Sequence, residues 1–98
     1  MTVTKTETRS SVDLRYPSMY NVILHNDNTT PFEFVIGLLV DIFNRQLTEA
    51  NDITVAVHEK GKGVAGTYNY EIAETKRQEA ILISRAKGFQ LKIDLEEL

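Results

Sequence analysis

The sequence predicts an α+β domain in which a small three-stranded antiparallel sheet packs against three helices, in the order strand, helix, helix, strand, helix, strand. Two kinds of pattern support this prediction. Segments near both ends of the chain alternate apolar and polar residues, as strands with one buried face do. Longer segments between them begin at capping or turn residues and end at glycine, as helices do. A chain of 98 residues suffices for one such domain and is short for two.

The first expected strand begins at Met19 and has one face on the core. Its two alternating sets are Tyr20, Val22 and Leu24 on one side and Asn21, Ile23 and His25 on the other. Residues 26–31, NDNTTP, are turn formers, and Pro31 suits a first helical turn with Thr30 as its cap. Residues 31–46 are apolar on nearly every side, so we expect a central helix packed on more than one face.

The second half of the chain predicts two more helices and two more strands. A second helix is expected to have Thr48 as its cap and to stop at Gly61, and residues 62–67, KGVAGT, indicate a short strand. Asn69 is suited to cap a third helix ending at Gly88, whose apolar residues do not mark one clean buried face. The last strand alternates apolar with polar residues, namely Leu91, Ile93 and Leu95 with Lys92 and Asp94.

Residues 1–18 differ from the rest of the chain. They are rich in threonine, serine and charge and have no periodic apolar pattern, so they bury too little surface to offset the entropy of ordering. We therefore expect a flexible N-terminal extension at residues 1–18 and one folded core at residues 19–98.

Composition argues against several classes of function. A net charge of −3 leaves no excess of lysine and arginine for a nucleic acid, and the absence of cysteine removes thiolate metal sites and a cysteine nucleophile. The longest apolar stretch, residues 35–40, is interrupted by Gly37 and is too short to span a bilayer, so we expect a cytoplasmic protein that contacts no membrane. No metal-ligand cluster or glycine-rich phosphate loop is apparent, so we expect no metal and no other cofactor.

Three segments of the sequence stand out by their motifs, namely YNVILHNDNTTPFEFVIGLL, VAVHEKGKGVAG and YEIAETK. Together they resemble the ClpS family of adaptors for the ATP-dependent Clp protease. The hallmarks that they share with the family are an Asn-Asp pair before a Thr-Pro helix start, an Ala-Val-His on the next helix and a Glu-Thr-Lys on the third. The likeness covers roughly residues 19–95 in consistent order, which makes it far more specific than any one motif.

The resemblance implies a non-enzymatic adaptor that binds the free N-terminal residue of N-degron substrates (Leu, Phe, Tyr or Trp) and delivers them to the ClpAP protease. Its implied partners are those substrates and the N-terminal domain of a ClpA-type AAA+ unfoldase, with the flexible extension aiding handover. The positions that match the family's amine-binding residues are Asn26, Asp27, Thr30 and His58. Those that match its side-chain pocket are Phe32, Val35, Thr54, Val57 and Leu91. Those that match its unfoldase contacts are Glu71 and Lys76.

These residue types suit the recognition of an ammonium group. A free N-terminus is a compact cation with three donors, so a selective site needs several acceptors around it. Asn26 offers a carbonyl oxygen, Asp27 a negative charge, and His58 a ring nitrogen that accepts only while it is unprotonated. Acidification is therefore expected to weaken the site.

The sequence also departs from the usual family pattern. Asn28 stands where many members carry a second acidic residue, which removes one negative charge near the ammonium. Phe32 and Thr54 each stand where a methionine commonly forms part of the pocket. Replacing flexible thioethers by a rigid ring and a short β-branched side chain changes the shape and adaptability of the pocket, so the preferred N-terminal residue stays open.

Each of these residues taken alone also fits a purely structural role. Asn26 and Asp27 fit a helix-entry turn, and His58 fits the end of a helix, where its cation would favour the dipole. Two other functions are compatible with parts of this pattern. A ClpS-like regulatory protein would dock on the unfoldase without binding N-degrons, and a hydrolase would use His58 with Asp27 and Thr30. The hydrolase has the least support because no nucleophile elbow or oxyanion motif accompanies these residues.

Overall fold

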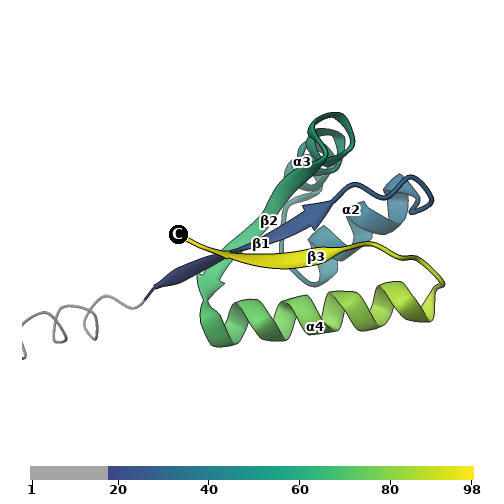
Figure 1. Cartoon of the computed structure of the whole chain (residues 1–98). Coiled ribbons are helices and arrows are strands. Elements are labelled where there is room, and N and C mark those ends of the chain that lie inside the picture. Colours follow the sequence, from purple (N-terminus) through teal and green to yellow (C-terminus); the bar gives the residue numbers. More distant parts are fainter. Residues whose placement is uncertain (1–17) are drawn as a thin grey trace, which may run out of the picture.

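The computed structural model describes residues 18–98, so the expected flexible extension lies outside the described residues except for Ser18. The observed architecture confirms the predicted α+β class and element order (Figure 1). The elements are β1 (Met19–His25), α2 (Phe32–Asp41), α3 (Leu47–Lys60), β2 (Lys62–Asn69), α4 (Tyr70–Ala86) and β3 (Ile93–Glu97).

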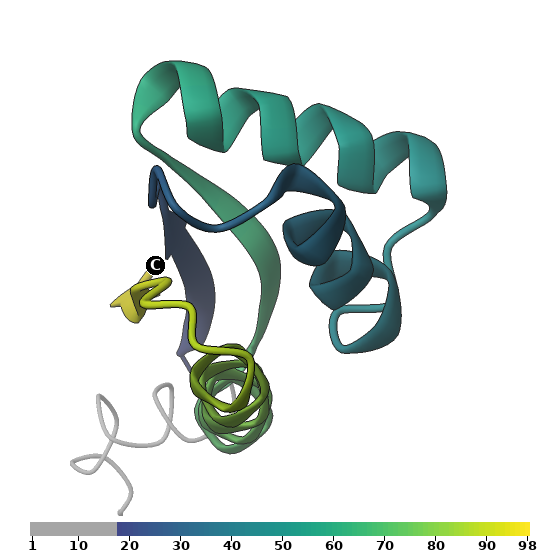
Figure 2. The same ribbon diagram turned by 90° about the vertical axis from the view of Figure 1, so that its right-hand side faces the viewer.

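The sheet has β1 at its centre, with β2 and β3 antiparallel to it on either side. Val22 lies between Gly66 and Leu95, and Leu24 lies between Gly63 and Ile93. A view along α4 shows the three helices gathered around one side of the sheet (Figure 2). All of them contribute to one core cluster, whose buried members include Val22, Leu24, Val35, Leu38, Leu39, Ala50, Val57, Ala73, Ala80 and Ile93. Burial of this apolar surface is the main stabilising term of the fold.

The opposite face of the sheet is polar. The Thr67 hydroxyl donates to the Asn21 side-chain oxygen at 2.7 Å, and His25 Nε2 lies 2.8 Å from Asp94 Oδ2. Ile23 belongs to this face by its register but is only 5% exposed, because β1 is flanked by a strand on each side. The core face predicted for β1 is therefore confirmed at Val22 and Leu24, and Ile23 on the other face is buried as well.

Two of the predicted helix starts are wrong. Pro31, and not Thr30, is the residue before α2, and the Thr30 hydroxyl donates to Asp27 instead of capping the helix. α3 begins at Leu47, where the backbone N–H of Gln46 donates to Glu49 Oε1 at 3.1 Å, so Thr48 is already helical. In both places a neighbouring carboxylate accepts a hydrogen bond near the start of the helix. A charged acceptor of this kind makes a stronger hydrogen bond than a neutral one.

The other boundaries follow the predictions more closely. Gly61 ends α3 in the left-handed conformation, with φ of 93°, and Asn69 caps α4 by accepting from the Ile72 N–H at 3.0 Å. α4 ends at Ala86, two residues before Gly88, and its buried side, which the sequence left open, consists of Ala73, Ala80 and Ser84. The last strand begins at Ile93, two residues later than the alternation begins.

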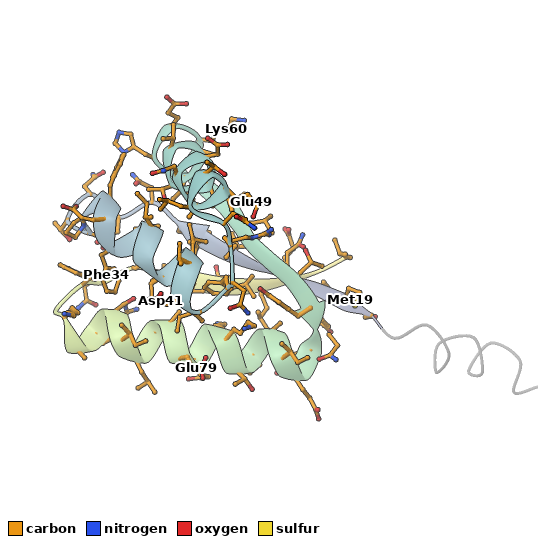
Figure 3. The ribbon with its side chains drawn as sticks, turned by 180° about the vertical axis from the view of Figure 1, so that it is seen from behind. Met19, Phe34, Asp41, Glu49, Lys60 and Glu79 are labelled. Atoms are coloured by element: carbon orange, nitrogen blue, oxygen red, sulfur yellow. The ribbon has the colours of Figure 1, made fainter. Side chains whose placement is uncertain are left out.

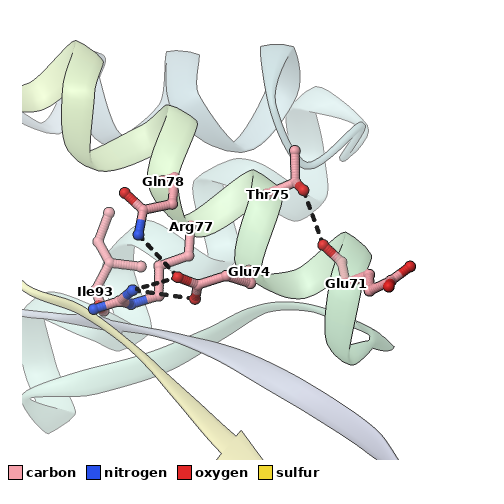
Figure 4. Close-up of polar contacts among 6 residues, drawn as sticks. All are labelled: Glu71, Glu74, Thr75, Arg77, Gln78 and Ile93. Atoms are coloured by element: carbon pink, nitrogen blue, oxygen red, sulfur yellow. Dashed lines mark hydrogen bonds and ion pairs between the residues drawn. The ribbon is translucent and has the colours of Figure 1, made fainter.

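Two arginines of α4 hold the chain that leads into β3. Arg85 Nη1 donates to the carbonyl of Leu91 at 2.8 Å, and Arg77 Nε donates to the carbonyl of Ile93 at 2.8 Å. Figure 4 shows that Arg77 is in turn paired with Glu74 on the same helix. These bonds fix the position of Leu91, which is 1% exposed and reaches the candidate site. None of the described helices is long and apolar enough to cross a bilayer.

Candidate functional site

One small cavity brings together all nine residues that the sequence assigned to amine and side-chain binding. The lining residues are Asn26, Asp27, Thr30, Phe32, Val35, Thr54, Val57, His58 and Leu91. They come from four separate parts of the chain, so their meeting is a product of the fold.

Each element brings its residues to the cavity for a simple geometric reason. The turn after β1 carries Asn26 and Asp27, and the backbone N–H of Asn26 donates to the Gly61 carbonyl at 2.8 Å. This bond ties the turn to the end of α3. On α3, Thr54, Val57 and His58 are spaced three and four residues apart and therefore share one face of the helix. The cavity thus lies where the β1 turn, the first turn of α2 and the last turns of α3 meet.

Asp27 carries the negative charge of the site. Its Oδ2 atom accepts from the Thr30 hydroxyl at 2.5 Å and from the Thr29 hydroxyl at 2.9 Å. These bonds, the Thr30 bond foremost, lower the pKa of the Asp27 carboxyl below its ordinary value, because they stabilise the ionised form. Thr30 therefore acts on the site through Asp27, and the carboxylate stays charged at neutral pH.

Asn28, which stands where many family members carry a second acidic residue, orients Asn26. The Asn26 side-chain N–H donates to Asn28 Oδ1 at 3.1 Å. With its amide nitrogen engaged in this bond, Asn26 keeps its side-chain oxygen as an acceptor.

The floor of the cavity is apolar and tightly packed. Leu91, Thr54, Val57 and Val35 are 1%, 2%, 4% and 6% exposed. The Thr54 hydroxyl donates to the Ala50 carbonyl at 2.8 Å, so its hydrogen is already engaged within α3. The floor is therefore suited to an apolar side chain.

Two exposed rings cover this floor. The Phe32 and His58 rings meet edge to face, with centroids 5.1 Å apart and planes at 67°. The volume left inside the cavity is about 10 Å³. A larger apolar groove of about 260 Å³ lies between α2 and α4, near Phe34 and Asp41 (Figure 3), but it contains none of the predicted site residues.

Neither Glu71 nor Lys76, the predicted unfoldase contacts, lines this cavity. The Lys76 ammonium donates to the Ile42 carbonyl at 2.7 Å and lies 5.3 Å from the centre of the Tyr68 ring. Glu71 is exposed in the first turn of α4, and its side chain points away from the bonds that surround Glu74 (Figure 4). Lys76 is thus engaged within the domain, whereas Glu71 is presented to solvent.

The residues between Ser18 and Leu98 form no group of three or more histidine, aspartate or glutamate side chains that could hold a metal ion. The Asn26 side-chain oxygen and the Asp27 carboxylate are acceptors of the kind that a small cation with several hydrogen-bond donors requires. An ammonium group next to an apolar side chain meets that description.

Comparisons with known proteins show which proteins the chain is similar to. A family model for the ATP-dependent Clp protease adaptor protein ClpS matches residues 15–94. A ClpS adapter protein of Lawsonia intracellularis is 46% identical over 85 residues, which cover 87% of this chain and 78% of that protein. A ClpS adapter protein of Desulforapulum autotrophicum is 41% identical over 95 residues, which cover 95% of this chain and 91% of that protein. Agrobacterium tumefaciens ClpS2 bound to L-phenylalaninamide has a similar structure, with a TM-score of 0.80 and 33% identity over 84% of this chain and 99% of that one.

Proposed function

Because the chain belongs to the ClpS family of ATP-dependent Clp protease adaptor proteins, we propose that it binds N-degron substrates by their free first residue and delivers them to the ClpAP protease in the cytoplasm. The substrates begin with Leu, Phe, Tyr or Trp. The family is one of adaptors and not of catalysts, so the chain acts by binding. The observation that carries the proposal is that all nine expected binding residues line one cavity.

The polar end of the cavity offers the acceptors that an α-ammonium group needs. Asn26 keeps a free side-chain oxygen, Asp27 is ionised, and His58 supplies a ring nitrogen when it is unprotonated. An acetylated N-terminus has lost its charge and most of its donors, which would leave these acceptors unpaired. The site therefore selects for a free first residue.

The apolar floor receives the side chain of that residue. Val35, Val57 and Leu91 form its walls beside the amine-binding turn. L-phenylalaninamide, the ligand of the Agrobacterium relative, likewise joins a free amine to an apolar side chain. The similarity of the two structures supports the same use of the cavity here.

A regulatory protein that docks on the unfoldase without binding N-degrons is the second candidate. The cavity volume of about 10 Å³ favours it, because no side chain of an incoming residue fits there without a rearrangement. Asn26, Asp27 and His58 favour the first proposal, since docking alone requires no acceptor set.

We predict that peptides with a free N-terminal Leu, Phe, Tyr or Trp bind more tightly than the same peptides acetylated. The reason is that the acceptors around Asp27 are satisfied only by an ammonium group. Fluorescence anisotropy of labelled peptide pairs that differ only in acetylation measures the difference. Equal affinity for both forms, or no binding of either, would reject the proposed function in favour of the second candidate.

Docking on the N-terminal domain of a ClpA-type unfoldase is the other half of the proposal. Glu71 presents an exposed carboxylate for that contact, and Lys76 lies on the same helix. Lys76 is already bound to the Ile42 carbonyl, so its substitution would disturb both docking and the end of α2. Glu71 is therefore the better residue to test.

We expect Glu71→Gln to weaken binding to the isolated unfoldase domain severalfold, because it removes one interface charge. Glu79→Gln is the matched control, since Glu79 is also exposed on α4. Isothermal titration calorimetry measures docking, and peptide anisotropy should be the same for both variants. If the two variants docked as well as the parent, Glu71 would lie outside the interface.

A further inference from the structure

Two lining residues of the cavity contact each other in this structure. Phe32 and His58 meet edge to face, and the cavity that they help to line has a volume of about 10 Å³. That is about the space that a single water molecule requires. A leucine side chain, with its branched chain of carbon atoms, cannot enter until a lining residue moves.

The four residues that form the floor of the cavity are held in place. Val35, Thr54 and Val57 lie on helices and are 2–6% exposed, so moving them would disrupt the core. Thr54 is also bonded to the Ala50 carbonyl. Leu91 is 1% exposed, and Arg85 holds its carbonyl. Enlarging the cavity therefore depends on the exposed rings.

Of the two rings, Phe32 is the one free to turn away. It is 45% exposed and is the first residue of α2. Within a helix one side-chain rotamer is blocked by the preceding turn, but a residue at the first position has no preceding helical turn. Phe32 therefore has rotamers that interior helical residues lack, whereas His58 is the ring that the bound ammonium needs.

We propose that Phe32 is a gate that rests on His58 and turns outward to admit the first side chain of a substrate. This inference rests on the proposed function of the cavity. In the closed arrangement the Phe32 ring also lies against the imidazole that accepts from the ammonium group. A ligand must therefore compete with the Phe32 ring for both the apolar floor and His58.

The gate has a kinetic consequence. If only the open fraction of molecules binds, the apparent association rate is reduced by that fraction. An aromatic pair of this kind has a modest stability, so removing the ring should raise the association rate about two- to tenfold. The dissociation rate should rise as well, because Phe32 also contributes to the wall of the occupied cavity.

Stopped-flow measurement of a labelled Leu-initiated peptide tests the gate with the full chain, Phe32→Ala and Phe32→Leu. Tyr70→Leu is the matched control, because Tyr70 is 52% exposed and makes an edge-to-face contact with Tyr20, with centroids 5.2 Å apart, at a place outside the cavity lining. We expect faster association for both Phe32 variants and an unchanged rate for Tyr70→Leu. Unchanged association in the Phe32 variants would overturn the gate.

A second measurement needs no peptide. The chain has two histidines, so the His58 ring protons are assigned in a proton–carbon NMR spectrum by comparison with His25→Gln. Loss of the neighbouring aromatic ring in Phe32→Ala should shift the His58 signals, and Tyr70→Leu should not. If no variant prefers a free over an acetylated peptide, the proposed function fails, and this spectrum still decides whether the closed contact exists. Unmoved His58 signals would overturn it.

Discussion

Replacing Leu39 by alanine should lower the free energy of unfolding by about 2 to 5 kcal/mol, the range typical of buried leucines. Leu39 is fully buried on α2, within the cluster that joins the helices to the sheet. Truncation removes apolar contacts and leaves a space that the closely packed neighbours cannot fill. A domain of this size has about 5 to 15 kcal/mol of stability in total, so the loss is large.

Leu82→Ala is the matched control for Leu39→Ala. Leu82 is 68% exposed on α4, so the same truncation should change stability by about 0.5 kcal/mol or less. Urea unfolding followed by circular dichroism gives both values on one scale. Comparable losses in the two variants would show that Leu39 is not a core residue.

The fold could be predicted from the sequence because apolar residues recur with a different period in its strands than in its helices. Val22 and Leu24 alternate with outward residues, and both lie in the core as a period of two requires. The alternation carries no information on the burial of Ile23, which loses exposure because β1 lies at the centre of the sheet. The position of β1 between β2 and β3 is a tertiary property, and no local pattern specifies it.

The helix starts were less predictable because several residues competed to supply the same hydrogen bonds. Thr30 and Thr48 are both good capping residues by type. In the fold the Thr30 hydroxyl donates a hydrogen bond to Asp27, and the Gln46 backbone N–H donates one to Glu49. Local preference predicted the start of each helix to within two residues. The hydrogen bonds at the first two helix starts depend on the carboxylates of Asp27 and Glu49, which the preference of single residues for the capping position does not take into account.

The residues of the site could be predicted only through their joint resemblance to a family. Asn26 by itself fits a turn and Val35 by itself fits a core, and both readings are also true of the structure. The closed state of the cavity had no signal in the sequence. It depends on the side-chain orientation of Phe32 and on its distance from His58, which lies on a different helix.

We expect Asp27→Asn to weaken binding of a free-amine peptide roughly tenfold to a hundredfold, since hydrogen bonds to charged groups are the strongest of their kind. The substitution keeps the shape of the side chain and an oxygen that accepts from Thr29 or Thr30. It removes the negative charge, which those hydroxyls stabilise in the parent. The variant should therefore fold but lose its attraction for the ammonium group.

Asp52→Asn is the control for Asp27→Asn, because Asp52 is an exposed aspartate outside the cavity lining, and its loss changes the net charge by the same amount. Fluorescence anisotropy with the free and acetylated forms of one peptide distinguishes the loss of the charge interaction from a loss of binding caused by misfolding. The Asp27 variant should bind both forms almost equally weakly, while the Asp52 variant keeps the preference of the parent. If Asp27→Asn retained that preference in full, the ammonium group would be bound by Asn26 and His58 without the carboxylate.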